Sequence, residues 1–124
     1  MLKPKALAKV LEQTNTNGVR NTVLLNSEGS LLAFAGEDDR DAKVRAAISS
    51  SIWLSYEKAG KQFAPPGHMT QMILPCMDGS VVINRVPGGL LCLFAGKGVG
   101  LGMLRLKADK MAAHLEEPLK KLGT

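Results

Sequence analysis

Short turn signals divide the second half of the chain so closely that only hairpins fit between its strand-like runs. Residues 78–79 read Asp-Gly and residues 87–89 read Pro-Gly-Gly, and both follow runs rich in aliphatic side chains. Asp-Gly is a strong hairpin signal, whereas a parallel connection needs a dozen residues or more. The runs 68–76, 80–86 and 90–96 are therefore predicted to form three consecutive antiparallel strands.

A similar pattern near the N-terminus predicts another hairpin. The runs 19–26 and 30–36 flank the turn 27–29, which reads Ser-Glu-Gly. In the run 68–76, Pro75 has no N–H to donate, so this strand is expected at a sheet edge or to end there.

Three helices complete the expected order of helix, two strands, helix, three strands, helix. The first begins at Pro4, the second has an acidic start at 37–41 and stops before Gly60, and the third begins near Val99. The third helix is predicted to bury a stripe at steps of three and four and to kink at Pro118. The stripe consists of Leu101, Leu104, Ala108, Met111, Ala112, Leu115, Leu119 and Leu122. This order predicts an α+β fold with an antiparallel sheet covered by helices.

The second helix is apolar on two sides. One arc contains Val44, Ala47, Ile48, Ile52 and Leu54. The opposite arc, at ~100° per residue, contains Ala42, Ala46 and Trp53. A helix with two apolar sides needs two partners, so we interpret one as its own sheet and the other as another subunit. The alternative is a helix enclosed within this domain.

Size and composition bound the protein class. The chain has 124 residues, 45% of them hydrophobic, which suits a single domain over residues 1–124. No apolar run approaches the ~18 residues that span a bilayer, so direct membrane insertion is not expected. The net charge of +5 fits several acidic partners, but only 4% of residues are aromatic, and acids interrupt the cations of the terminal helices. Nucleic-acid binding is therefore disfavoured.

Residues 93–104, LFAGKGVGLGML, resemble a phosphate-binding loop at first sight. A Walker loop would need glycine where Leu91 stands and a hydroxyl where Gly98 stands. A dinucleotide loop would need glycine at Leu101 or Met103. The glycines are therefore predicted to allow tight packing of the last helix, without bound nucleotide.

No residue set predicts a catalytic, cofactor or metal site. His68 and His114 have no ligand at suitable spacing. Cys76 and Cys92 lie in apolar runs and are expected to be buried, reduced thiols. The chain is therefore not expected to be an enzyme.

The ordered set of stretches resembles the roadblock/light-chain domain family, and within it the roadblock subunits of the Ragulator complex. The match runs in order over nearly the whole chain. The stretches are MLKPKAL, LLNSEGSLLAFAG, AAISSSIW, MDGSVVINRV, LLCLFA, VGLGML and LEEPL. The resemblance implies a five-stranded antiparallel sheet in the order 2-1-5-4-3. The long helix would cover one face and the two terminal helices the other.

The same resemblance implies that the chain pairs through its second helix and third strand. The residues carried over to this interface are Val44, Ala47, Ile48, Ser51, Ile52, Ser55, Met69, Gln71 and Ile73. Which arc of the helix faces the partner is left open at this point.

The implied function is that of a non-catalytic adaptor without cofactors. Its partners would be a sister roadblock subunit, other Ragulator subunits including a lipidated membrane anchor, and Rag GTPases. It would lie on the cytoplasmic face of late endosomes and lysosomes and support amino-acid signalling to mTOR and MAPK signalling. The alternatives left open are direct regulation of a small GTPase and, for the isolated chain, a homodimer.

Overall fold

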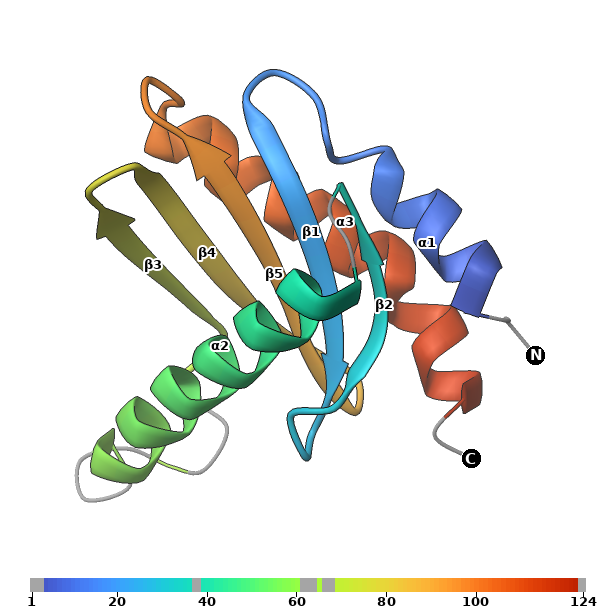
Figure 1. The fold of residues 1–124 in the computed structure, drawn as a ribbon. Coiled ribbons are helices and arrows are strands. Elements are labelled where there is room, and N and C mark those ends of the chain that lie inside the picture. Colours follow the sequence, from blue (N-terminus) through green and yellow to red (C-terminus); the bar gives the residue numbers. More distant parts are fainter. Residues whose placement is uncertain (1–3, 37–38, 61–64, 66–68, 123–124) are drawn as a thin grey trace.

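The computed structural model describes residues 4–36, 39–60, 65 and 69–122. Its helices and strands follow one another in the order that the sequence predicts (Figure 1). They are α1 (Pro4–Glu12), β1 (Val19–Asn26), β2 (Leu31–Ala35), α2 (Asp39–Gly60), β3 (Gln71–Cys76), β4 (Gly79–Val86), β5 (Gly89–Gly96) and α3 (Leu101–Leu122). The expected start of the second helix at 37–38 and the expected strand residue His68 lie outside the described residues.

The strands form one antiparallel sheet in the order β2-β1-β5-β4-β3. This confirms the order that the family resemblance implies. The β1–β2 hairpin and the three strands β3, β4 and β5 join through pairing of β1 with β5, so the hydrophobic strand β5 lies in the middle of the sheet. Pro75 lies on β3, which is an edge strand, as its missing N–H predicts.

The β3–β4 turn lies one residue earlier than predicted. Cys76 pairs with Gly79, so Met77 and Asp78 form the loop and Gly79 already belongs to β4. Gly79 has φ +149°, and a Cβ there would collide with the carbonyl oxygen of Ala95 on β5. The glycine is therefore required both by its positive φ and by the close approach of β5 inside the sheet.

The β4–β5 turn is confirmed. Pro87 and Gly88 connect the paired residues Val86 and Gly89, and Gly88 has φ +75°. Proline followed by a glycine with positive φ is the residue pair that a type II turn favours.

Two buried clusters lie on opposite faces of the sheet, which confirms the expected placement of the helices. The cluster under α1 and α3 includes Leu11, Leu91 and Leu115. The cluster under α2 includes Trp53 and Ile83. In Figure 1, α2 crosses one face of the sheet and α3 runs along the other. The fold thus has three layers, with α2 alone on its side.

The start of α3 differs from the prediction. Leu104, Ala108, Met111, Leu115 and Leu119 are buried as expected, and Ala112 is half-buried, whereas Leu101 is 47% exposed. The first turn of α3 therefore contributes little to the core. The side chain of Leu122 is not described, and the helix continues through Pro118 to that residue.

The predicted tight packing of the glycine-rich segment is wrong for most of it. A Cβ at Gly96 would lie 2.7 Å from the guanidinium of Arg20, but at Gly98, Gly100 or Gly102 it would meet nothing within 4 Å. Only the strand end is crowded, because the segment after it runs over open surface.

The predicted burial of both thiols is half right. Cys92 is buried, whereas Cys76 is exposed. Cys76 is the last residue of β3, and both it and the preceding Pro75 are exposed.

Candidate protein interface on α2 and β3

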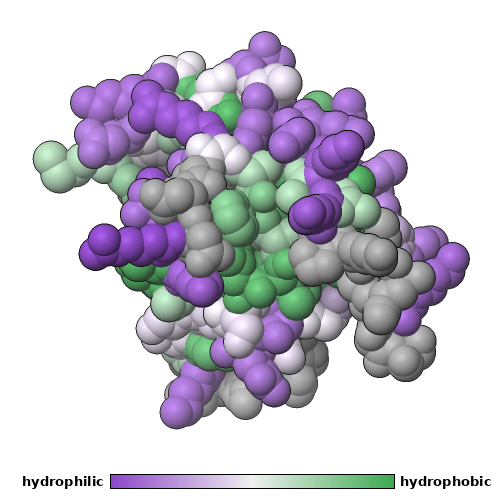
Figure 2. Space-filling model, turned by 45° about the vertical axis from the view of Figure 1, so that its right-hand side comes forward, coloured by the Kyte–Doolittle hydropathy of each residue, from purple (hydrophilic) through white to green (hydrophobic). Residues whose placement is uncertain are grey.

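The exposed large apolar side chains of the described residues fall into three groups. They lie on α2 (Val44, Ile48, Leu54 and Tyr56), at the β3–β4 turn (Met77) and at the start of α3 (Leu101, Met103 and Leu106). Figure 2 shows that apolar surface is unevenly distributed: on the side it presents, green side chains gather in one central area bordered by purple ones.

The structure settles which arc of α2 faces the sheet. Ala42, Ala46 and Trp53 are buried, and the intervening Ser49 and Ser50 are buried with them. These small residues let the helix approach closely: a Cβ at Gly29 of the β1–β2 turn would lie only 2.8 Å from the hydroxyl oxygen of Ser50. The other arc therefore faces away from this chain's own core.

That outer arc is unusually apolar for a helix surface. Val44 is 53% exposed and Ile48 is 55% exposed, while Ile52 is half-buried. Ala47, Ser51 and Ser55, which the resemblance also assigns to the interface, lie on the same exposed surface. Exposed apolar side chains on this arc do not stabilise the monomer. A contiguous apolar surface of this kind is typical of one that another protein covers.

A groove of about 470 Å³ runs beside this arc. One wall is formed by Ile48 and Ile52 of α2, and the others include Leu74 of β3 and Phe94 of β5. The guanidinium of Arg45 lies over the Phe94 ring, 4.9 Å from its centroid, and so covers the apolar floor. The groove is therefore apolar along α2 and β3 and cationic at one side.

The residues assigned to β3 separate onto two faces. Met72 and Leu74 pack with the cluster under α2, whereas Ile73 packs with the cluster under α3. The Gln71 amide nitrogen donates to Asn84 Oδ1 at 2.7 Å and to Asp109 Oδ1 of α3 at 2.9 Å. The side chains of Gln71 and Ile73 thus lie on the face opposite α2.

Sequence reasoning therefore missed Met72, Leu74 and Phe94 as residues beside α2. The alternation of side chains along a strand could have identified the first two, because residues 72 and 74 must face opposite to residues 71 and 73. Phe94 could not have been found in this way, since only the sheet order brings β5 beneath α2.

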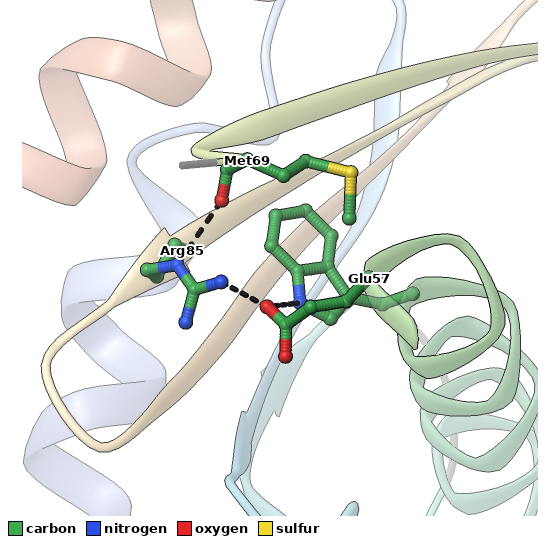
Figure 3. Close-up of polar contacts among 4 residues, drawn as sticks. Glu57, Met69 and Arg85 are labelled. Carbon is green, nitrogen blue, oxygen red and sulfur yellow. Dashed lines mark hydrogen bonds and ion pairs between the residues drawn. The ribbon is translucent and has the colours of Figure 1, made fainter. Parts of the chain in front are cut away.

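A polar clamp fixes the C-terminal half of α2 to the sheet (Figure 3). Arg85 of β4 donates from Nε to the carbonyl oxygen of Met69 at 3.1 Å, and its Nη2 pairs with Glu57 of α2. The same Glu57 oxygen accepts a hydrogen bond from Trp53 Nε1 at 3.2 Å, and the Arg85 guanidinium lies 5.3 Å from the Trp53 ring centroid. The clamp sets α2 relative to the residue that leads into β3.

Among the described residues, the titratable side chains do not assemble a reaction centre. Burial raises the pKa of the Cys92 thiol to about 12, although a hydrogen bond with Ser49 partly opposes the shift. A thiol with so high a pKa is a poor nucleophile. His114 is exposed on α3, and His68 is outside the described residues.

Two features are absent from the described part of the chain. No group of three or more metal-binding side chains lies together there. None of the helices in that part has the length and apolar character needed to cross a membrane.

Comparison with solved structures identifies the same arrangement elsewhere. The Roadblock/LC7 domain from Streptomyces avermitilis superposes with a TM-score of 0.84 over 91% of this chain and 97% of that one, at 18% identity. Myxococcus xanthus MglB superposes with a TM-score of 0.82 over 94% of this chain and 89% of that one, at 16% identity. These likenesses concern the fold.

Sequence comparison identifies the family. Among curated proteins, the Ragulator complex protein LAMTOR2 homolog of Caenorhabditis elegans is 36% identical over 122 residues, which cover 96% of this chain and 94% of that protein. The model of the Roadblock/LC7 domain matches residues 5–95. The chain therefore belongs to the Roadblock/LC7 domain family.

Proposed function

We propose that this chain is a non-catalytic adaptor subunit of a Ragulator-like complex and acts as one roadblock unit over residues 1–124. The similarity to the LAMTOR2 homolog supports membership of such a complex. The observation that carries the adaptor role is the apolar outer arc of α2 beside an open apolar groove. Both features suit lasting contact with another protein and neither serves this chain's own core.

The partner at this surface is a sister roadblock subunit. Its own long helix would lie along the outer arc of α2, and its edge strand would extend the sheet from β3. Pairing in this way would cover Ile48 and Ile52 and would also satisfy the open edge of β3, which is otherwise a site for unwanted strand pairing.

In the complete assembly, other subunits, one of them lipidated, would hold the pair on the cytoplasmic face of late endosomes and lysosomes. The assembled complex would recruit Rag GTPases for amino-acid signalling to mTOR and would support MAPK signalling. The contribution of this chain is to present surfaces, so the proposal requires no cofactor and no reacting group.

The test is co-purification with the sister roadblock subunit after replacement of Ile48 by Asp. Because Ile48 is 55% exposed, the change should alter the stability of the chain by no more than about 0.5 kcal/mol. Pairing should weaken by at least ~100-fold, since a charge would be buried without a partner.

Ala113→Asp is the matched control, because Ala113 is exposed on α3, on the far side of the sheet. It introduces the same charge and should leave pairing unchanged. Undiminished pairing of both Ile48→Asp and Leu74→Asp, in chains that remain folded, would contradict the proposal.

A further inference from the structure

The start of α3 carries a second exposed apolar surface, separate from the one on α2. Leu101, Met103 and Leu106 are 47%, 39% and 54% exposed. At ~100° per residue, Met103 and Leu106 point away from the buried stripe that contains Leu104 and Ala108. We call the residues Leu101, Met103 and Leu106, together with Gly98, Gly100 and Gly102, the α3 surface. It lies on the opposite side of the sheet from α2, since the two helices cover different clusters.

Gly98 of the α3 surface has φ +87°, which favours glycine, but the other two glycines, Gly100 and Gly102, are not explained by this chain. A Cβ at Gly100 or Gly102 would meet nothing within 4 Å, and neither residue has a positive φ. Gly102 lies inside the first turn of the helix, where glycine is less favourable than alanine. A residue that weakens its own helix and has open space around it is suited to the close approach of another backbone.

The charge beside this surface is positive. Lys97, Arg105 and Lys110 are exposed and have no hydrogen-bond or ion-pair partner among the residues that the structure describes. Asp109, the acid in this part of the helix, already accepts a hydrogen bond from Gln71 of β3. The cations are thus available to an acidic partner.

The helix end itself adds to this preference. Leu104 N–H donates to Gly100 O at 3.1 Å, so the N–H groups of Leu101, Gly102 and Met103 have no acceptor within the helix. Gly100, the residue before the helix, has no side-chain oxygen that could cap them. These donors and the helix dipole favour a negatively charged group.

We propose that the α3 surface binds an acidic amphipathic helix of a partner protein. The leucine and methionine side chains would take its apolar face, the glycines would permit close contact, and its carboxylates would meet Lys97, Arg105, Lys110 and the uncapped N–H groups. The inference does not depend on the pairing proposed for α2. A chain with both surfaces could hold two different proteins at once, on opposite sides of one sheet.

A protein segment fits this surface better than a lipid bilayer. Hydrocarbon offers no acceptor for the exposed N–H groups of the first turn. Segments that insert into membrane surfaces also combine dense cations with bulky aromatic residues. The α3 surface has no aromatic residue, and the cations beside it that have no described partner are Lys97, Arg105 and Lys110.

The experiment uses the full chain, labelled with ¹⁵N, and an 18-residue helical peptide with one leucine face and one glutamate face. A second peptide, in which lysine replaces every glutamate, is the charge control. The acidic peptide should shift the amide resonances of residues 97–110 and the lysine peptide should not. Absence of shifts, or equal shifts with both peptides, would overturn the proposal.

Two variants sharpen the test. Leu106→Glu should weaken binding of the acidic peptide at least ~tenfold, whereas Ala113→Glu, which adds the same charge two turns further along α3, should weaken it less than ~threefold. Gly102→Ala should raise the thermal midpoint of the chain, because alanine is the better helix former, and should nevertheless weaken peptide binding several-fold. Unchanged binding by Leu106→Glu and Gly102→Ala would contradict the proposed surface.

Two further measurements test whether a membrane or a second copy of this chain occupies the α3 surface instead. Vesicles of phosphatidylcholine with 30% phosphatidylserine should not bind the chain in a flotation assay. Sedimentation of the chain should not change with Leu106→Glu. Leu106-dependent vesicle binding would assign the surface to a membrane, and Leu106-dependent self-association would assign it to a second copy, so either result would overturn the proposal. Ile48→Asp should leave peptide binding intact, which distinguishes this surface from the one on α2.

Discussion

Replacing Arg85 by Ala tests whether the polar clamp holds α2 on the sheet. The change removes the hydrogen bond to the Met69 carbonyl at 3.1 Å, the ion pair with Glu57 and the cation–π contact with Trp53. The Arg85 and Glu57 side chains are 36% and 28% exposed, so solvent weakens their attraction. Water can also reach the groups that the substitution leaves unpaired.

Together these contributions predict a moderate loss in the free energy of unfolding. The hydrogen bond contributes about 1 kcal/mol, the partly exposed ion pair about 0.5 kcal/mol and the cation–π contact about 0.5 kcal/mol. The free energy of unfolding should therefore fall by about 2 kcal/mol. For a domain of this size that corresponds to a thermal midpoint lower by roughly 8 °C.

The assay is urea denaturation of the isolated chain at fixed protein concentration, followed by far-ultraviolet circular dichroism. Arg105→Ala is the control, because Arg105 is exposed on α3 without a described partner, and it should change the free energy of unfolding by less than about 0.5 kcal/mol. A double-mutant cycle with Glu57→Gln should give a coupling energy of about 0.5 to 1 kcal/mol. If Arg85→Ala is no more destabilising than Arg105→Ala, the clamp does not stabilise the fold.

Further predictions concern the two thiols and the β1–β2 turn. In native protein Ellman's reagent should label Cys76 rapidly and Cys92 only on unfolding, and two rapidly reacting thiols would contradict the burial. Burial raises the pKa of the Cys92 thiol from 9.0 to about 12. The contribution of the neutral thiol to stability should therefore be complete below pH 9 and should decline as the pH rises towards 12. Denaturation at several pH values, with Cys92→Ala as the reference, measures this decline. Gly29→Ala should destabilise the chain by about 1–2 kcal/mol, since φ is +84° and the new Cβ would lie 2.8 Å from the Ser50 hydroxyl, whereas Gly100→Ala should be neutral in the same melt.

The local pattern of the sequence predicted the elements of the fold, and the family resemblance predicted their order. Turn residues such as Pro87 and Gly88 act within a few positions, so the hairpins could be predicted without tertiary information. Pairing of β1 with β5 joins residues about 70 positions apart, and no local signal specifies it. That pairing was available only through the resemblance.

The incorrect predictions for Gly79 and Leu101 also depend on contacts between distant parts of the chain. Gly79 was read as a turn residue, but it is required by the carbonyl of Ala95 on a neighbouring strand. Leu101 continues the helical stripe in sequence, yet it lies before the point where α3 meets the sheet. Helical and strand periodicity predict which way a side chain points, not whether another element is there to cover it.

The candidate interface was predictable to a similar extent. The two apolar arcs of α2 could be recognised from spacing alone, and the structure identifies Ala42, Ala46 and Trp53 as the inner arc. The contribution of β3 required the phase of the strand, which places Leu74 rather than Ile73 beside α2. The clamp at Arg85 was not predictable, because its partners are distant in sequence.

The unequal size of the two buried clusters affects the local stability and turnover of the chain when it is unassembled. Among the described residues, 16 buried apolar side chains lie under α1 and α3, and seven lie under α2. The layer formed by α2 should therefore open at a lower free energy than the rest, and its amides should exchange with solvent first. A newly made copy without the proposed partner would expose its least protected helix to chaperones and proteases, so the amount of this chain in a cell should follow the amount of the proposed partner.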